Sequence, residues 1–249
     1  MGQPDQDEVL AGGNSGEVVR RGDTVLRTAG EWTPAVHRLL RHLESAGMPG
    51  VPRVLGVEDD RRERLSFVPG ECAQYPLPDH VWGEDVLLDV ARLTRRLHDA
   101  SIGCDRTGPW RSVPVEPSEV ICHVDIAPYN VTFDEGGRVV GLIDFDHATP
   151  APRIWDVAHA VYRFAPLTTD PSTDPFTEDE RLARVDAFVD AYGWPWTRAE
   201  VLAVIVQRLV GLEDHATAES VKQARSDLLE HAALYRRDAA FVRSLIGVV

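Results

Sequence analysis

The chain has 249 residues, of which 43% are hydrophobic and 27% charged, and its formal net charge is −14. This balance is typical of a globular protein with one domain or two close-packed lobes, and it excludes disorder as the main state. The acidity disfavours nucleic acid or an anionic membrane as the main partner, and it is compatible with a cationic small molecule.

The sequence predicts a cytoplasmic protein. No apolar run approaches the roughly 18 residues of a membrane-spanning helix, and the polar, acidic start does not resemble a secretory signal. Three scattered cysteines without a CxxC pair indicate reduced thiols. They are Cys72, Cys104 and Cys122.

The first part of the chain is predicted to be β-rich. A glycine-rich stretch at 11–16 precedes the first strand, and the charged run 58–63 is predicted to be a turn. A helix is expected from an N-cap at Thr33, with Pro34 in its first position. Pro69 breaks the pattern, and we expect a first lobe over 1–69 and a second over 70–249. Four runs favour strands: 17–20, 24–27, 51–57 and 64–68.

The second part is predicted to be mostly helical. Apolar spacing indicates a helix around Val86–Leu97, and a last helical stretch is expected from about Thr217. A hairpin with the turn 134–137 interrupts the helices, and the loop 166–175 is a candidate lid. Together these elements predict an α+β fold. Two capping boxes open helices: Thr177 with Glu180, and Thr197 with Glu200.

The segment I-C-H-V-D-I-A-P-Y-N at 121–130, followed by the hairpin and then I-D-F-D, carries the chemistry. If Asp134 pairs with Arg138 across the turn, Asn130 lies opposite Leu142. Asp144 then lies two residues beyond that register, roughly 7 Å along the strand. The hairpin is therefore predicted to place an amide and a carboxylate within reach of one divalent cation.

Asp125 lies five residues before Asn130 on the same loop and can approach that cation. Magnesium prefers oxygen ligands from one or two carboxylates and from substrate phosphates. Phosphoryl transfer to an alcohol needs this metal, and it needs a carboxylate that accepts the hydroxyl proton. Asp125, Asn130 and Asp144 supply such a set.

These motifs resemble the aminoglycoside phosphotransferase and choline-kinase-like family, the small-molecule relatives of protein kinases. The similarity runs from about Leu10 to the helices after Asp156, and it includes short members that are phosphotransferases or peptide-toxin immunity proteins. The resemblance implies a protein-kinase-like bilobal fold. Its N-terminal lobe, over 1–69, would bind the nucleotide, and its helical lobe, over 70–249, would hold the catalytic loop and the substrate site.

The resemblance also implies roles for the motif residues. Asp125 matches the catalytic base, and Asn130 and Asp144 match the two magnesium ligands. His123 matches a histidine that braces the catalytic loop. Asp146 matches the second carboxylate of the metal motif, and Asp156 matches an aspartate that steadies the catalytic loop. For the nucleotide, Gly13 and Ser15 would contact the phosphates, and Phe67 and Val68 would contact the adenine.

Two positions depart from the family pattern. The third strand of a kinase carries a lysine that holds the α- and β-phosphates, but the only lysine here is Lys222, so Arg27 takes that place. His37 lies near the position of the glutamate that normally pairs with this cation. Glu31 and Glu44 flank it as alternatives.

We therefore expect an ATP-dependent O-phosphotransferase, with GTP as an open alternative, that uses Mg²⁺ and acts on a small hydroxylated molecule. The leading acceptor is an antibiotic such as an aminoglycoside, in resistance or self-immunity. The alternatives are a catalytically silent immunity or binding protein, and a metabolic kinase for choline, homoserine or a sugar. Carboxylates around Asp125 would favour a polycation, and an aromatic box would favour a quaternary amine. The oligomeric state stays open.

Overall fold

The computed structural model describes residues 7–10, 17–59, 61–170, 176–223 and 225–247. The chain divides into two compact units. Unit 1 comprises Met1–Cys72, Arg96–His123 and Asn130–Pro152, and unit 2 comprises Ala73–Arg95, Val124–Tyr129 and Arg153–Val249. Each unit gathers segments from distant parts of the chain. The two predicted lobes, 1–69 and 70–249, stay a prediction.

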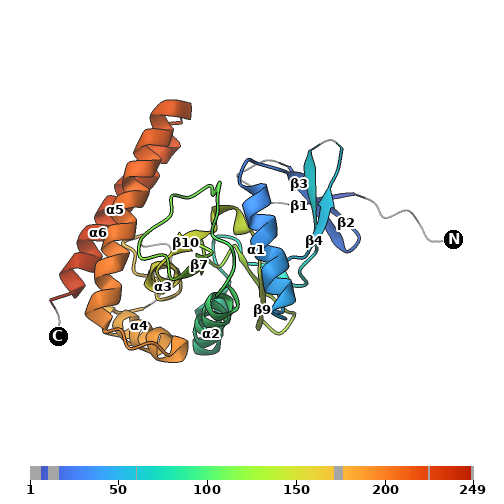
Figure 1. Cartoon of the computed structure of the whole chain (residues 1–249). Coiled ribbons are helices and arrows are strands. Elements are labelled where there is room, and N and C mark those ends of the chain that lie inside the picture. The colour runs from blue at the N-terminus through green and yellow to red at the C-terminus, as the bar shows by residue number, and fades with distance from the viewer. Residues whose placement is uncertain (1–6, 11–16, 60, 171–175, 224, 248–249) are drawn as a thin grey trace. The chain divides into compact units, whose positions relative to one another are not determined.

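Unit 1 contains a five-stranded antiparallel sheet in the order β1-β2-β3-β5-β4 (Figure 1). Its strands are β1 (Glu8–Leu10), β2 (Val18–Arg21), β3 (Thr24–Thr28), β4 (Val54–Val57) and β5 (Arg62–Ser66). Helix α1 (Thr33–Ser45) buries Leu39, Leu40 and Leu43, which recur at helical spacing. The predicted N-cap was wrong by one residue, because Trp32 occupies the cap position and Thr33 is already helical.

Strand β5 begins earlier than predicted. Residues 62 and 63 were expected in the charged turn, but they pair with β3, and Glu63 lies opposite Arg27. Side chains alternate between the two faces of a strand, so Glu63 points to the same face as Leu65. Both are buried, with exposures of 1% and 5%. The sheet therefore places a carboxylate beside Arg27.

The hairpin in unit 1 contains a β-bulge. The turn forms as predicted, since Asp134 donates its backbone N–H to the carbonyl oxygen of Arg138 at 2.9 Å. The register shifts by one residue between Thr132 and Phe133, so Leu142 lies opposite Val131 rather than Asn130. The predicted register is thus wrong beyond the bulge. Three short strands form this sheet, in the order β6-β8-β9: β6 (Glu71–Cys72), β8 (Val131–Phe133) and β9 (Val139–Leu142).

The bulge reduces the offset between Asn130 and Asp144 in the strand pairing. Asn130 accepts the N–H of Ile143 on its backbone carbonyl at 2.9 Å, so Asp144 lies one residue beyond the paired position instead of two. Gly141 on β9 allows the backbone of Gly50 to approach this strand, because a Cβ at that position would come within 2.6 Å of the carbonyl oxygen of Gly50.

The remaining elements of unit 1 are the paired strands β7 (Val120–Cys122) and β10 (Thr149–Ala151) and the short 3₁₀ helix η2 (Phe145–His147). Helix α2 (Glu84–Ala100) contributes to both units. A second 3₁₀ helix, η1 (Asp79–Trp82), lies in unit 2. Together with the helices of unit 2, these elements confirm the predicted α+β class.

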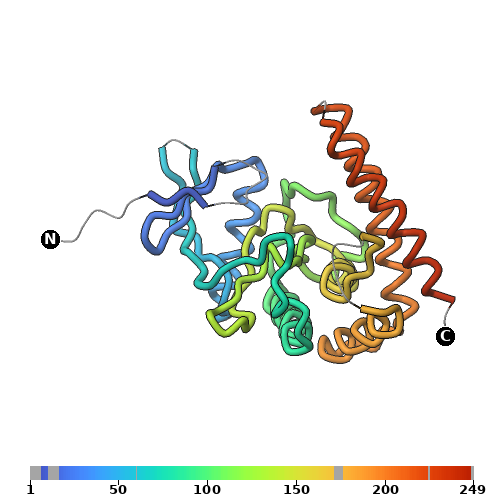
Figure 2. Tube along the Cα trace, turned by 180° about the vertical axis from the view of Figure 1, so that it is seen from behind, coloured from blue at the N-terminus to red at the C-terminus, as the bar shows by residue number. Residues whose placement is uncertain are grey.

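Unit 2 is helical. Its helices are α3 (Arg153–Phe164), α4 (Glu178–Tyr192), α5 (Arg198–Gln223) and α6 (Asp227–Leu245). Both predicted capping boxes form, at Thr177 and at Thr197. The predicted last helix was wrong, because Thr217 lies inside α5, which runs beside the separate helix α6 (Figure 2). In the part of the chain that the structure describes, none of the helices combines the length and apolarity needed to cross a bilayer.

Candidate active site

Arg27 lies at the centre of a charged cluster in unit 1. Its Nε donates to Glu63 Oε1 at 2.7 Å, Nη1 to Asp144 Oδ1 at 2.9 Å, and Nη2 to Asp146 Oδ1 at 2.6 Å. The guanidinium side chain is 15% exposed, and the three carboxylates raise its pKa even though burial opposes the charged form. Each nitrogen of the Arg27 guanidinium thus donates to a different carboxylate.

Glu63 is the residue of this cluster that the sequence analysis missed. Its Oε1 accepts from Arg27, and its Oε2 lies 2.6 Å from Nε2 of His37 on α1. His37, predicted to lie near the position of the family's glutamate, reaches Arg27 through the carboxylate of Glu63. Neither Glu31 nor Glu44 makes an ion pair with Arg27 in the described structure, where Glu44 pairs with Arg53 instead.

The two carboxylates of the I-D-F-D motif differ in accessibility. Asp144 has a left-handed backbone with φ of 62°, and its side chain is 45% exposed. Asp146 is 8% exposed and is held through both oxygens, by Arg27 and by Arg111 at 3.3 Å. Burial raises the pKa of Asp146, against the effect of Arg27. Asp144 is therefore the carboxylate that a ligand can reach.

Asn130 and His123 support the same hairpin. Asn130 is 4% exposed and directly precedes β8. His123 is buried, with Nε2 2.9 Å from the carbonyl oxygen of Ile143, and its ring packs edge-on against Phe145 at 4.7 Å between centroids. His123 therefore fixes the backbone immediately before Asp144.

The donor set in unit 1 is compatible with a magnesium ion. It offers the carboxylate oxygens of Asp144 and the amide oxygen of Asn130, which are the hard oxygen ligands that Mg²⁺ takes. Oδ2 of Asp144 makes no hydrogen bond within the described residues. Three carboxylates against the guanidinium groups of Arg27 and Arg111 leave an excess of negative charge in the cluster.

Asp125 lies in unit 2 and is 27% exposed. Its Oδ1 accepts hydrogen bonds from the hydroxyl of Tyr129 at 2.8 Å and from Nε2 of His159 at 3.1 Å. Burial, assisted by the charge of Arg208, lowers the pKa of His159 to about 4. The imidazole is therefore neutral at pH 7, and the bond to Asp125 places its proton on Nε2.

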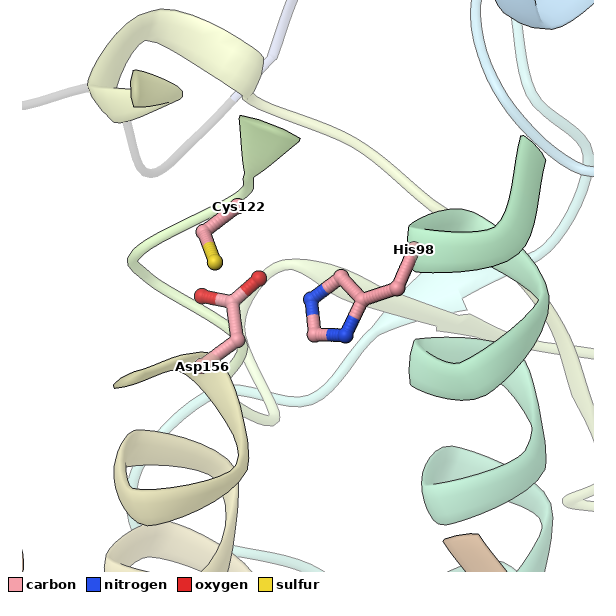
Figure 3. Close-up of side chains that lie close together, drawn as sticks. All are labelled: His98, Cys122 and Asp156. Carbon is pink, nitrogen blue, oxygen red and sulfur yellow. The ribbon is translucent and has the colours of Figure 1, made fainter. Parts of the chain in front are cut away.

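The segment that carries Asp125 is held in an unfavourable backbone conformation. Val124 has φ of 75°, which is costly for a β-branched residue. Its N–H donates to Asp156 Oδ1 at 2.6 Å, and its carbonyl oxygen accepts from Nη2 of Arg208 at 2.7 Å. Asp156 is fully buried in the first turn of α3 (Figure 3). Two helices, α3 and α5, thus hold the segment that carries Asp125, through the backbone N–H and the carbonyl oxygen of Val124.

The predicted nucleotide contacts are only partly described. Gly13 and Ser15 lie outside the described residues. Phe67 donates its backbone N–H to the carbonyl oxygen of Asp23 at 2.8 Å, and its ring lies under the guanidinium of Arg20. Val68 is buried with 6% exposure. The role of Phe67 and Val68 in binding adenine stays a prediction. The backbone N–H of Phe67 is not available to adenine, because it already donates to Asp23.

Solved structures with a similar fold are kinases of small molecules. The ethanolamine kinase of Plasmodium vivax superposes with a TM-score of 0.70 at 13% identity, covering 96% of this chain and 84% of that one. A choline/ethanolamine kinase family protein from Mesorhizobium loti has a TM-score of 0.63 at 17% identity, covering 96% and 92%. A GDP complex of an aminoglycoside 2'-phosphotransferase has a TM-score of 0.65 at 14% identity, covering 96% and 93%. The protein-kinase-like fold is confirmed.

The fold and the motif define the class of protein as a small-molecule phosphotransferase. Residues 104–202 match the model of the phosphotransferase enzyme family. Over 230 residues the chain is 34% identical to the trifolitoxin immunity protein of Rhizobium leguminosarum bv. trifolii. The matched region covers 88% of this chain and 85% of the relative. The chain belongs to the phosphotransferase enzyme family.

The burial of His159, which lowers the pKa of its imidazole against the opposing effect of Asp125, predicts a pH-dependent stability. The pKa of His159 is about 4 in the folded protein and about 6.5 in the unfolded chain, so between these values the unfolded chain binds more protons. Stability is present above pH 6.5 and is lost as the pH falls toward 4. His159→Gln keeps an N–H near the position of Nε2 but does not titrate. Relative to this variant, the wild type should lose about 3 kcal/mol between pH 7 and pH 4, measured by urea unfolding. Parallel stability profiles for the two proteins would contradict the assignment.

Proposed function

We propose that this protein transfers the terminal phosphoryl group of a nucleoside triphosphate, ATP with Mg²⁺, to a hydroxyl group of a small molecule. The observation that carries the proposal is the state of Asp125. Its carboxylate is partly exposed, it receives two hydrogen bonds on one oxygen, and it lies on a backbone held by α3 and α5. A carboxylate positioned in this way can accept the proton of the acceptor hydroxyl.

The residues of unit 1 would bind the nucleotide. Asn130 and Asp144 would hold the metal, which neutralises charge on the phosphates when bound. Arg27 presents a planar fork that matches phosphate oxygens as well as carboxylates, so in this proposal it exchanges a carboxylate partner for phosphate. His123 and Asp146 would position these groups, and Asp156 would position Asp125 from within unit 2. The backbones of Gly13 and Ser15 for phosphate, and of Phe67 and Val68 for adenine, complete the proposed set.

The acceptor in this proposal is an antibiotic, and the biological role is self-immunity or resistance. The name of the trifolitoxin immunity protein supports immunity, and a structural neighbour bound to kanamycin supports an antibiotic. The place of action would be the cytoplasm, consistent with three free cysteines. A metabolic kinase of an amino alcohol would use the same mechanism with a different acceptor, and the ethanolamine kinase neighbour supports this alternative.

The test is nucleotide consumption with Mg²⁺, using ATP and GTP separately, against hydroxylated antibiotics, choline and amino alcohols. Products are examined by mass for an added phosphate, and Asp125→Asn serves as the blank. Turnover with one acceptor that disappears in the variant supports the proposal. Turnover that is unchanged in the variant would remove Asp125 from the mechanism.

A catalytically silent binding protein is the second candidate, and one observation favours it. Arg27 forms ion pairs with Asp144 and Asp146, the two carboxylates of the metal motif. If these pairs persist, they occupy the groups that a metal–nucleotide complex needs. Titration calorimetry with ATP, with and without Mg²⁺, distinguishes the candidates, because the silent protein would show no magnesium-dependent binding.

Asp144→Asn is expected to weaken magnesium-dependent nucleotide binding by at least about tenfold, because it removes the accessible carboxylate of the proposed metal site. Asp134→Asn is the matched control, since Asp134 lies at the turn of the same hairpin, where it pairs with Arg138. The measurement is titration calorimetry with ATP at fixed Mg²⁺. An affinity equal to that of the control would argue against Asp144 as a metal ligand.

A further inference from the structure

Arg163 lies in a box of tyrosines in unit 2. Its guanidinium carbon is 5.5 Å from the ring centroid of Tyr75, 5.5 Å from that of Tyr129 and 5.7 Å from that of Tyr162. The tyrosines come from three segments of the chain, before α2, after Asp125 and within α3. An aromatic box of this kind commonly holds a cation supplied by a ligand. Here the protein's own arginine fills it.

The hydrogen-bonding capacity of Arg163 is mostly unused. Nη2 donates to the hydroxyl of Tyr75, and Nε is buried without any hydrogen-bond partner. Among the described residues, no carboxylate lies within ion-pair distance of this guanidinium. A guanidinium has five N–H donors, and a buried charge without an anionic partner is costly. The tyrosine rings offset part of that cost, but they do not satisfy the donors.

Two guanidinium groups lie near the proposed base, although the whole chain carries a net charge of −14. Arg163 and Arg208 are both close enough to His159 to lower its pKa. Asp238, a buried carboxylate of α6, is already bonded by Thr168, Thr169 and Tyr162. The arrangement therefore does not match the cluster of carboxylates expected for a polycationic acceptor.

Tyr129 connects Arg163 with the catalytic carboxylate. Its ring faces the guanidinium at 5.5 Å, and its hydroxyl donates to Asp125 Oδ1 at 2.8 Å. One tyrosine side chain thus separates the arginine from the proposed base. A small molecule whose hydroxyl group lies at Asp125 can place a second group at Arg163.

We propose that Arg163, held by Tyr75, Tyr129 and Tyr162, is a subsite for a carboxylate group of the acceptor. A carboxylate would accept N–H groups of the guanidinium in charge-assisted hydrogen bonds. Carboxylate binding at Arg163 does not depend on the proposed function; only the identification of the bound molecule as the acceptor does. It narrows the acceptor class to hydroxyl compounds that also carry a carboxylate. A quaternary amine is excluded from this box because a cation already occupies it.

The test uses acetate as the probe and the side-chain ¹⁵N–¹H signals of arginine in the full-length protein. Titration with sodium acetate, against sodium chloride at equal ionic strength, should shift the Nε signal of Arg163 saturably. Arg163→Lys assigns the signal by its disappearance, and Tyr75→Phe assigns it independently by removing the hydrogen-bond partner. Arg95 is the internal control, because it also lies over aromatic rings but donates to the backbone carbonyls of Tyr192 and Gly193.

In the variants, which lack this Nε, the response is followed at the backbone N–H signal of Phe164. We expect Arg163→Gln to abolish the acetate response there and Arg163→Lys to weaken it at least about tenfold, since lysine lacks the planar guanidinium group. An Nε signal that responds equally to acetate and chloride would overturn the subsite. Magnesium-dependent ATP binding is measured separately, by titration calorimetry, as the test of the proposed function. Acetate binding without magnesium-dependent ATP binding would support the subsite and count against the kinase assignment. Magnesium-dependent ATP binding without an acetate response would do the reverse.

Discussion

Replacing Asp125 by asparagine is expected to lower phosphoryl transfer by roughly a hundred- to ten-thousand-fold while leaving nucleotide affinity within about twofold of the wild type. Asparagine preserves the size of the side chain and can still accept the hydrogen bond from Tyr129. It cannot accept a proton from the acceptor hydroxyl. Transfer is measured as acceptor-dependent nucleotide consumption, and affinity by titration calorimetry with ATP and Mg²⁺.

The matched control for this variant is Asp186→Asn. Asp186 is also in unit 2, and its ion pair with Arg198 joins two partly exposed side chains. Loss of such a pair costs about 0–1 kcal/mol and should leave transfer unchanged. If Asp125→Asn loses nucleotide binding as strongly as it loses transfer, Asp125 acts on the nucleotide or on the fold, and its assignment as the base is wrong.

Glu63→Gln is expected to have the largest effect on stability, about 3–5 kcal/mol in the free energy of unfolding. Glu63 is 1% exposed and accepts from both Arg27 and His37. The amide removes the negative charge and presents donors where the guanidinium and the imidazole already compete for acceptors. Arg27 would keep at most a weaker bond from Nε to the neutral amide oxygen, so the KM for the nucleotide should rise. Urea unfolding and steady-state kinetics measure the two effects.

Glu44→Gln provides the control for this substitution. Its carboxylate pairs with Arg53 at 3.7 Å between exposed side chains, so the change should cost no more than about 1 kcal/mol. A double-mutant cycle between Glu63→Gln and His37→Gln adds a second criterion. Additive effects would show that His37 does not act through Glu63, and they would contradict the relay from α1 to Arg27.

The sequence indicated which residues are candidates for the site, but not the contacts that support them. Asp125, Asn130 and Asp144 were proposed because a loop, a hairpin turn and a second strand follow one another in the chain, so local spacing determines their order. The bulge between Thr132 and Phe133 has no such signal. It shifts the pairing of β8 with β9 by one residue from the predicted register.

Glu63 and the tyrosine box escaped prediction for different reasons. Glu63 lies in a strongly charged run, E-D-D-R-R-E-R, which conceals the alternation that would place it on the same face as the buried Leu65. Tyr162 directly precedes Arg163, but Tyr75 and Tyr129 come from two other segments, so the assembly of the set is a property of the tertiary structure. Spacing along the chain cannot indicate such a set.

The left-handed conformation of Val124 has a consequence for how the protein can vary. This conformation is unfavourable for an isolated valine, so Asp156 on α3 and Arg208 on α5 provide the energy that maintains it. The geometry of the segment that carries Asp125 therefore depends on helices that follow it in the chain. Substitutions that loosen α5 would lower the fraction of molecules with a competent loop, even where they touch neither nucleotide nor acceptor. On warming, activity should therefore be lost when the packing of α3 and α5 loosens, and not only when the β-sheet unfolds.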